Sequence, residues 1–138
     1  MHELKQKNYI ELFPGKLFKG YLNEESIYID DDYFSLIAPA IRNGFKCYTG
    51  FERFEIEKTQ WYSILNELSK LREIIGCKDR QRLKTYISTF FLQESICEWQ
   101  LEQYKKIGVL KLMRFIEELI DWIETELEEN ETITLIGL

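Results

Sequence analysis

A long amphipathic period between residues 109 and 127 is the strongest constraint that this sequence places on a fold. Apolar side chains recur there at steps of three and four residues: Val109, Leu112, Met113, Ile116, Leu119, Ile120, Ile123 and Leu127. This spacing predicts an α-helix with one apolar face. We expect that face to belong to a hydrophobic core.

Two further segments also predict helices. The first begins at Thr59 and ends at Gly76, with apolar side chains at Trp61, Ile64, Leu65, Leu68, Leu71 and Ile75. The second covers residues 33–43, where Asp31 or Asp32 can cap the first turn and Gly44 suits the left-handed residue after the last. Pro39 is expected to kink or divide this helix.

Residues 78–106 allow two interpretations. Leu83, Tyr86, Ile87 and Phe90 have helical spacing, yet residues 85–91 are also rich enough in β-branched and aromatic side chains for a strand. We favour a helix and leave the strand as the alternative.

Strands are predicted at both ends of the chain and near its middle. Residues 8–13, 16–22 and 26–30 predict an antiparallel meander, because Pro14 and Gly15 suit a type II turn. Residues 45–56 predict an aromatic strand with a bulge at Gly50, and residues 132–136 have strand composition. The sequence therefore predicts one α+β domain over residues 1–138, a small, mostly antiparallel sheet packed against several amphipathic helices.

Composition restricts the environment in which this domain works. The hydrophobic share of 45% suffices for a packed core, and Cys47, Cys77 and Cys97 are too scattered for a disulfide framework or a zinc ribbon. We expect core cysteines in a reducing compartment. Neither a secretory leader nor a span of about 18 apolar residues is present, so we expect a cytoplasmic protein without a membrane partner.

The sequence contains no recognisable arrangement of catalytic residues. The only histidine, His2, lies beside the first methionine, and no glycines stand in a phosphate-binding frame. Asp30, Asp31 and Asp32 lack the Gly and the distal Glu of a calcium loop, so we expect them to cap a helix. We predict no catalytic residue, no metal site, no cofactor and no enzymatic activity.

One basic cluster interrupts an acidic chain. Lys78, Arg80, Arg82 and Lys84 precede Tyr86 and Phe90, an order typical of some nucleic-acid-binding surfaces. The formal net charge of −6 argues against a nucleic-acid partner. Pairing with acidic helices, within the molecule or in a dimer, and simple solvation both remain open.

The acidic C-terminal segment is the most informative feature for function. Residues 115–138 hold eight acids and no Lys or Arg, and several of the acids lie at a helix end, where the macrodipole favours cations. Either these acids are a solvated face, or they bind a basic protein partner. For the second interpretation we predict a partner surface made by Glu124, Glu128 and Glu131, by Asp30, Asp31 and Asp32, and by Glu24 and Glu25.

The order of elements in residues 9–75 resembles a known class of proteins. Residues 27–34 (IYIDDDYF), residues 48–51 (YTGF) and the Trp61 helix together resemble the small immunity proteins of bacterial contact-dependent growth inhibition and related polymorphic toxin systems. The resemblance implies a cytoplasmic inhibitor that binds and blocks a toxin domain, such as a basic nuclease, delivered by a neighbouring cell. It includes no motif from which functional residues could be transferred.

Two other functions stay open beside this one. The chain could be a homo-oligomeric adaptor that uses its aromatic-rich helices, so either a monomer or a homodimer is compatible with the sequence. It could also hold a small molecule, or a cryptic active site, in a pocket between sheet and helices where carboxylates with shifted pKa values converge.

Overall fold

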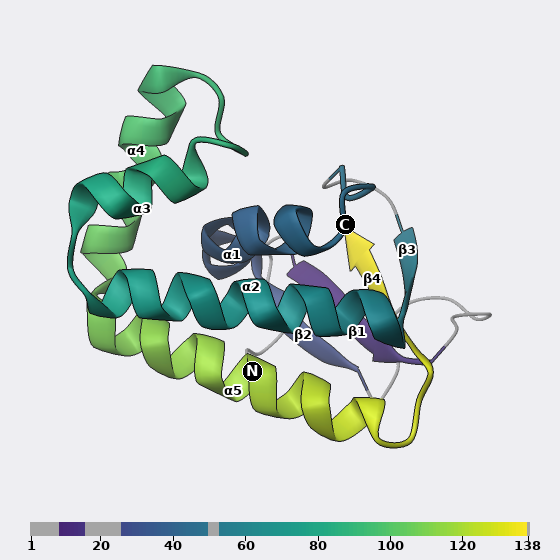
Figure 1. Cartoon of the computed structure of the whole chain (residues 1–138). Helices are drawn as coiled ribbons and strands as arrows, with labels where there is room; N and C mark the ends of the chain where they lie inside the picture. Colours follow the sequence, from purple (N-terminus) through teal and green to yellow (C-terminus); the bar gives the residue numbers. More distant parts are fainter. Residues whose placement is uncertain (1–8, 16–25, 50–52, 138) are drawn as a thin grey trace.

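A computed structural model describes residues 9–15, 26–49 and 53–137 of the chain (Figure 1). In these residues, four strands form one sheet, and five helices accompany it. The elements in chain order are β1 (Tyr9–Pro14), β2 (Ile27–Asp30), α1 (Asp31–Gly44), β3 (Arg53–Glu57), α2 (Lys58–Gly76), α3 (Arg80–Ile87), α4 (Glu94–Ile107), α5 (Val109–Leu127) and β4 (Thr132–Gly137). The predicted α+β class is confirmed.

The sheet has the strand order β2-β1-β4-β3, and every neighbouring pair is antiparallel. The predicted strand near residue 132 is confirmed as β4, which lies at the centre of the sheet. Leu12 of β1 stands opposite Leu135 of β4, and both are buried in the core. Since side chains alternate between faces, this register turns one apolar face of the sheet toward the helices.

The N-terminal strands agree in part with the predicted meander. β1 and β2 are confirmed, but they pair directly with each other, and β4 occupies the other side of β1. The expected return strand at residues 16–22 lies outside the described residues.

The predicted aromatic strand is shorter than its composition indicates. β3 begins at Arg53 and forms an edge of the sheet, while residues 45–49 form a turn after α1. Phe45 and Tyr48 are buried and contact the ring of Phe54. The aromatic residues there mark burial rather than strand, and the bulge expected at Gly50 lies outside the described residues.

The first helix differs from the prediction at its cap and at two further residues. The cap is Asp30, and Asp31 and Asp32, which were expected to cap the helix, belong to its first turn. α1 continues without a break through Pro39, so the expected division does not occur. Gly44 is the last helical residue and does not have a positive φ. Instead, a Cβ built on Gly44 would lie 2.5 Å from the Cα of Ile64, so the glycine permits close approach of α1 and α2.

Residues 78–106 form two helices, so the strand alternative is wrong and the favoured helix is divided. α3 and α4 gather at one end of the helical layer (Figure 1). Ile87, which has high strand propensity, is fully buried at the end of α3. Among the described helices, none has the length and apolar character that crossing a bilayer requires.

The two strongest helix predictions are confirmed by α2 and α5, which pack side by side (Figure 1). Trp61 of α2 is completely buried, and its indole Nε1 donates a hydrogen bond of 3.0 Å to the carbonyl oxygen of Ile133 in β4.

The prediction that all three cysteines belong to the core holds only for Cys97, since Cys47 and Cys77 are exposed. Both lie at or just after helix ends, where the chain turns at the surface.

Candidate functional site

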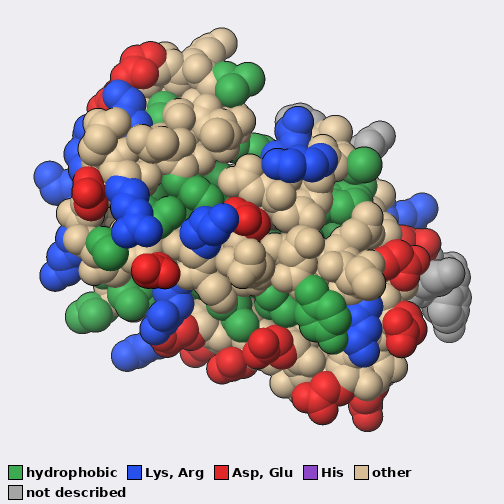
Figure 2. Space-filling view, in the orientation of Figure 1, with side chains coloured by type: hydrophobic (Ala, Val, Ile, Leu, Met, Phe, Trp, Pro, Cys, Tyr) green, Lys and Arg blue, Asp and Glu red, His purple; other side chains and the backbone are tan. Residues whose placement is uncertain are grey.

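The outer side of α5 is a row of carboxylates. Five exposed acids recur there at steps of one, three and four residues, and we call them the carboxylate face: Glu117, Glu118, Asp121, Glu124 and Glu128. Figure 2 shows acidic side chains along the edge of the molecule that α5 forms. The core side of the same helix carries the apolar stripe, so burial of that stripe turns the acids outward.

Little positive charge neutralises this face. Glu117 pairs with Arg72 of α2, whose Nε donates a hydrogen bond of 2.8 Å. Within the described residues, no Lys or Arg side chain pairs with the other four acids. Glu128 is also the C-terminal cap residue of α5, where the helix dipole is unfavourable for an anion.

The second predicted acidic group lies at the N-terminus of α1. Asp30 is buried and caps the helix, accepting a hydrogen bond of 2.9 Å from the backbone N–H of Asp32. Asp31 and Asp32 are exposed in the first turn. Partial desolvation, followed by the charges of Asp32 and Asp30, raises the pKa of Asp31.

The structure does not bring these two acidic groups together. Asp30 pairs with Tyr9 at the start of β1, whereas Gly15, after the other end of β1, bonds to the backbone of Thr132 beside Glu131. The length of β1 therefore separates them, about 17 Å at the usual rise per residue. Glu131 is exposed on the α5 side, while Glu24 and Glu25 lie outside the described residues.

The basic cluster pairs within the molecule, one of the two alternatives left open by the sequence. Arg80 forms an ion pair with Glu98 of α4, and Lys84 contacts the same carboxylate at 2.7 Å and also pairs with Glu94. The hydrogen bond from Lys84, and then that from Arg80, lowers the pKa of Glu98 to about 2. These contacts hold α3 against α4 and leave Lys78 outside the ion-pair network of the described residues.

A cavity of about 370 Å³ lies where α2, α3, α4 and α5 meet. Two tight corners form it: the α2–α3 corner at Lys78, with φ of 58°, and the α4–α5 corner at Gly108, with φ of 97°. Most of the lining is apolar, from Ile74, Ile75, Leu83, Leu101, Tyr104, Val109 and Leu112. The Tyr104 hydroxyl donates a hydrogen bond to the carbonyl oxygen of Leu36, so Tyr104 contributes its apolar ring to the cavity lining.

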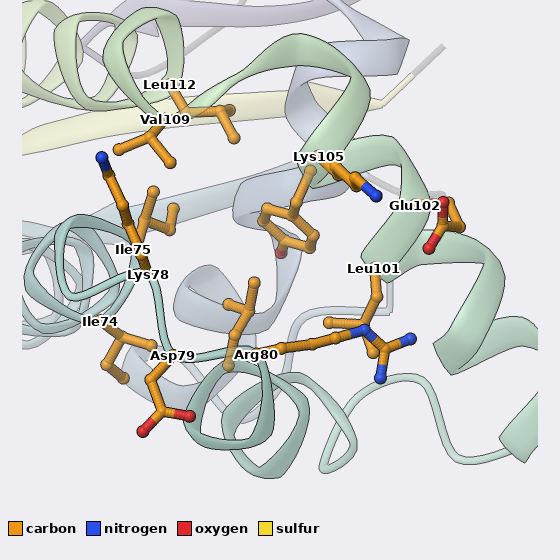
Figure 3. A pocket seen from close by; sticks show the side chains of 12 residues that line it. Ile74, Ile75, Lys78, Asp79, Arg80, Leu101, Glu102, Lys105, Val109 and Leu112 are labelled. Atoms are coloured by element: carbon orange, nitrogen blue, oxygen red, sulfur yellow. The ribbon is translucent and has the colours of Figure 1, made fainter.

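Charged side chains surround this apolar lining (Figure 3). Lys78, Asp79 and Arg80 come from the α2–α3 corner, and Glu102 and Lys105 from α4. This cavity lies among helices, whereas the small-molecule alternative expected a pocket between sheet and helices. Ile75, Val109 and Leu112 belong to predicted apolar helix faces, and helical periodicity cannot distinguish a filled core from a partly open one.

A third surface is apolar and exposed. Leu92, just before α4, and Ile96 and Trp99 on α4 have exposed fractions of 82%, 44% and 59%. The spacing of three residues places Ile96 and Trp99 on one side of α4, and Leu92 precedes the helix. Within the described residues, no group of three or more His, Cys, Asp or Glu side chains is arranged to hold a metal ion.

Similarity to known proteins adds nothing to this geometry. No match to the chain is found among protein-family models, curated proteins or solved structures. The features that bear on function are therefore the carboxylate face, the cavity among the helices and the exposed apolar side of α4.

Proposed function

We propose that this protein is a non-enzymatic binding module that holds a basic protein partner against the C-terminal half of α5. The observation that carries the proposal is the carboxylate face, of which only Glu117 has a cationic partner within the described residues. Glu124 and Glu128 of this face, together with Glu131 beyond the helix, form the proposed contact. Asp31 and Asp32 stand apart from it and would serve only a partner large enough to span β1.

An unneutralised row of acids has an electrostatic cost that a basic partner removes. Like charges at steps of three and four residues on one helix face repel each other, and the helix dipole adds to this near Glu128. A cationic surface relieves both effects and is attracted before contact, which raises the association rate.

The most specific form of the proposal follows from the resemblance to immunity proteins. In that form the partner is a toxin domain with a basic substrate cleft, such as a nuclease, and the protein blocks the cleft in the cytoplasm. An acidic helix competes with a phosphate backbone for the same cations, so inhibition and binding use one surface.

The test is to replace Glu124, Glu128 and Glu131 together with Gln. Folding stability should stay the same or rise slightly, because repulsion and the unfavourable dipole interaction are relieved. Association with a partner captured from the native host should slow. The difference from the unchanged protein should fade when the Debye length falls from about 10 Å at 0.1 M salt to about 3 Å at 1 M.

A matched control removes charge elsewhere on the surface. Glu55 on β3 and Glu73 on α2 are exposed acids outside the carboxylate face, and their replacement by Gln should leave the association rate nearly unchanged. If both variants associate at the rate of the unchanged protein at either salt concentration, the carboxylate face is only a solvated surface.

The exposed apolar side of α4 favours a second candidate function, a homo-oligomeric adaptor. Trp99 is more than half exposed, and isologous pairing of two copies through this side would bury it together with Ile96. Sedimentation at rising concentration should then show a dimer that Trp99→Gln abolishes. Tyr62→Gln is the control, since Tyr62 is exposed to a similar extent, 52%, on a different helix. A monomer at every concentration removes this candidate.

A further inference from the structure

We propose that the cavity between α2, α3, α4 and α5 binds a small amphipathic carboxylate, with its apolar part inside and the carboxylate at the rim beside Lys78. This ligand site is independent of the protein-binding surface on α5. Its volume of about 370 Å³ falls within the usual range of ligand sites, roughly 300–1,000 Å³.

The lining determines what the interior accepts. Aliphatic side chains from all four helices face the space, and the one hydroxyl nearby, that of Tyr104, is already bonded to Leu36. An apolar chain loses no hydrogen bond on entering such an interior, whereas a polar group would lose its bonds to water. The interior therefore selects hydrocarbon.

The rim determines the charge of the ligand. Arg80 is paired with Glu98, and the Asp79 carboxylate caps α3 by accepting hydrogen bonds from the N–H groups of Gln81 and Arg82. Lys78 and Lys105 then remain as cations without an ion pair in the described part of the chain, and the carboxylates of Asp79 and Glu102 lie beside them in the lining. The five charged residues that line the cavity, Lys78, Asp79, Arg80, Glu102 and Lys105, carry one net positive charge between them, which favours a ligand with one negative charge.

The backbone at Lys78 supports a role for this side chain. Its φ of 58° lies in the left-handed region that favours glycine, and no other non-glycine residue among those described has a positive φ. The same backbone ends α2, since the N–H of Lys78 donates a bond of 3.1 Å to the carbonyl oxygen of Ile75. Glycine would adopt this backbone with less strain, and the lysine that stands here instead places an ammonium group at the cavity rim (Figure 3).

Three probes with the same chain separate the contributions of charge and hydrocarbon. Decanoate, decanol and decyltrimethylammonium are titrated calorimetrically into the full chain, below their micelle concentrations. We expect decanoate to bind most tightly and the cation most weakly. Shortening decanoate should weaken binding roughly fourfold per methylene that leaves the cavity.

Two substitutions then locate the site. Lys78→Gly should leave the melting temperature unchanged or raised, yet weaken decanoate by up to about fivefold, the effect of a solvent-exposed ion pair, while decanol is unaffected. Val109→Phe should fill the cavity and weaken both probes. Lys111→Gln, an exposed cation of α5 outside the lining, is the control and should change neither.

Several results would overturn the proposal. Absence of saturable decanoate binding would remove the site, and equal binding of decanoate and decyltrimethylammonium would remove the role of the rim. If Lys78→Gly leaves the affinity for decanoate unchanged, Lys78 has no role in binding the carboxylate. Flotation of the protein with anionic phospholipid vesicles, blocked by Val109→Phe, would overturn the free acid as the ligand. The cavity would then take the acyl chain of a lipid from the bilayer.

Discussion

At the scale of single residues, Trp61 connects the helical layer to the sheet. Its buried ring fills the space above β4, and its Nε1 hydrogen bond to Ile133 fixes the position of α2 over the central strand. We expect Trp61→Ala to lower the free energy of unfolding by about 3–5 kcal/mol, because it leaves a large cavity. Denaturant titration measures this loss.

A second tryptophan provides the matched control for that measurement. Trp99 has an exposed fraction of 59%, so Trp99→Ala should change the free energy of unfolding by only about 0.5 kcal/mol or less in the monomer. A loss below about 1 kcal/mol for Trp61→Ala would contradict the burial of its ring.

Two glycines that end helices should respond oppositely to alanine. A Cβ on Gly44 would meet the backbone of Ile64 at 2.5 Å, so Gly44→Ala should cost about 1–3 kcal/mol as the helices separate. A Cβ on Gly76 would lie 3.3 Å from the flexible end of Met113, so Gly76→Ala should be neutral or slightly stabilising. Similar thermal unfolding of both variants would refute the close approach of α1 and α2.

These glycines show how far single residues could be predicted. Gly44 and Gly76 indicated the ends of their helices correctly, because glycine disfavours the helix interior. The backbone conformation at these ends was not predicted. Gly44 was expected to be left-handed but is helical, and the left-handed residue after α2 is Lys78. A close approach between helices and a charge at a cavity rim both depend on partners distant in sequence, which local rules do not include.

At the scale of elements, charge pairing joins α3 to α4. The pKa of Glu98 is lowered from 4.5 to about 2 by Lys84 and Arg80, so its carboxylate is favoured in the folded state. Because the pKa of Glu98 is lower in the folded state than in the unfolded state, the ionised carboxylate stabilises the fold above pH 4.5. This contribution is lost as the pH falls toward about 2. Stability measured against pH should therefore decline through this window.

The variant Glu98→Gln tests that link directly. Its urea midpoint should lie below that of the unchanged protein at neutral pH, and the difference should narrow as the pH falls below 4.5. Glu118→Gln, which removes an acid without an ion pair among the described residues, should show no such narrowing. If the difference in urea midpoint between Glu98→Gln and the unchanged protein is the same at every pH, the ion pairs do not hold α3 to α4.

Elements were predicted in proportion to the length of their pattern. α2 and α5 repeat an apolar spacing over five turns, so both were found from sequence. Residues 45–49 and 85–91 have strand composition because Phe45, Tyr48 and Ile87 are buried, and burial favours the same residue types as a strand does. The candidate acids on α5 followed from its period, whereas the cavity depends on how four helices meet.

At the scale of the whole molecule, the hydrophobic core is the main feature that stabilises the fold. Buried side chains from sheet and helices form one continuous cluster, and no cluster of metal ligands occurs among the described residues. We expect dialysis against a strong chelator to leave the melting temperature unchanged. A large drop in that temperature would show that an ion contributes to folding.

The central position of β4 has a mechanical consequence. Ile10 near the start of β1 is the partner of Gly137 at the end of β4, so handles placed beside these residues would pull across the strands. The hydrogen bonds of an antiparallel pair lie perpendicular to the strands and would then break one after another, at low force. Handles beside Pro14 and Gly137 would instead load the same bonds together in shear, and optical tweezers should record a higher rupture force along that axis.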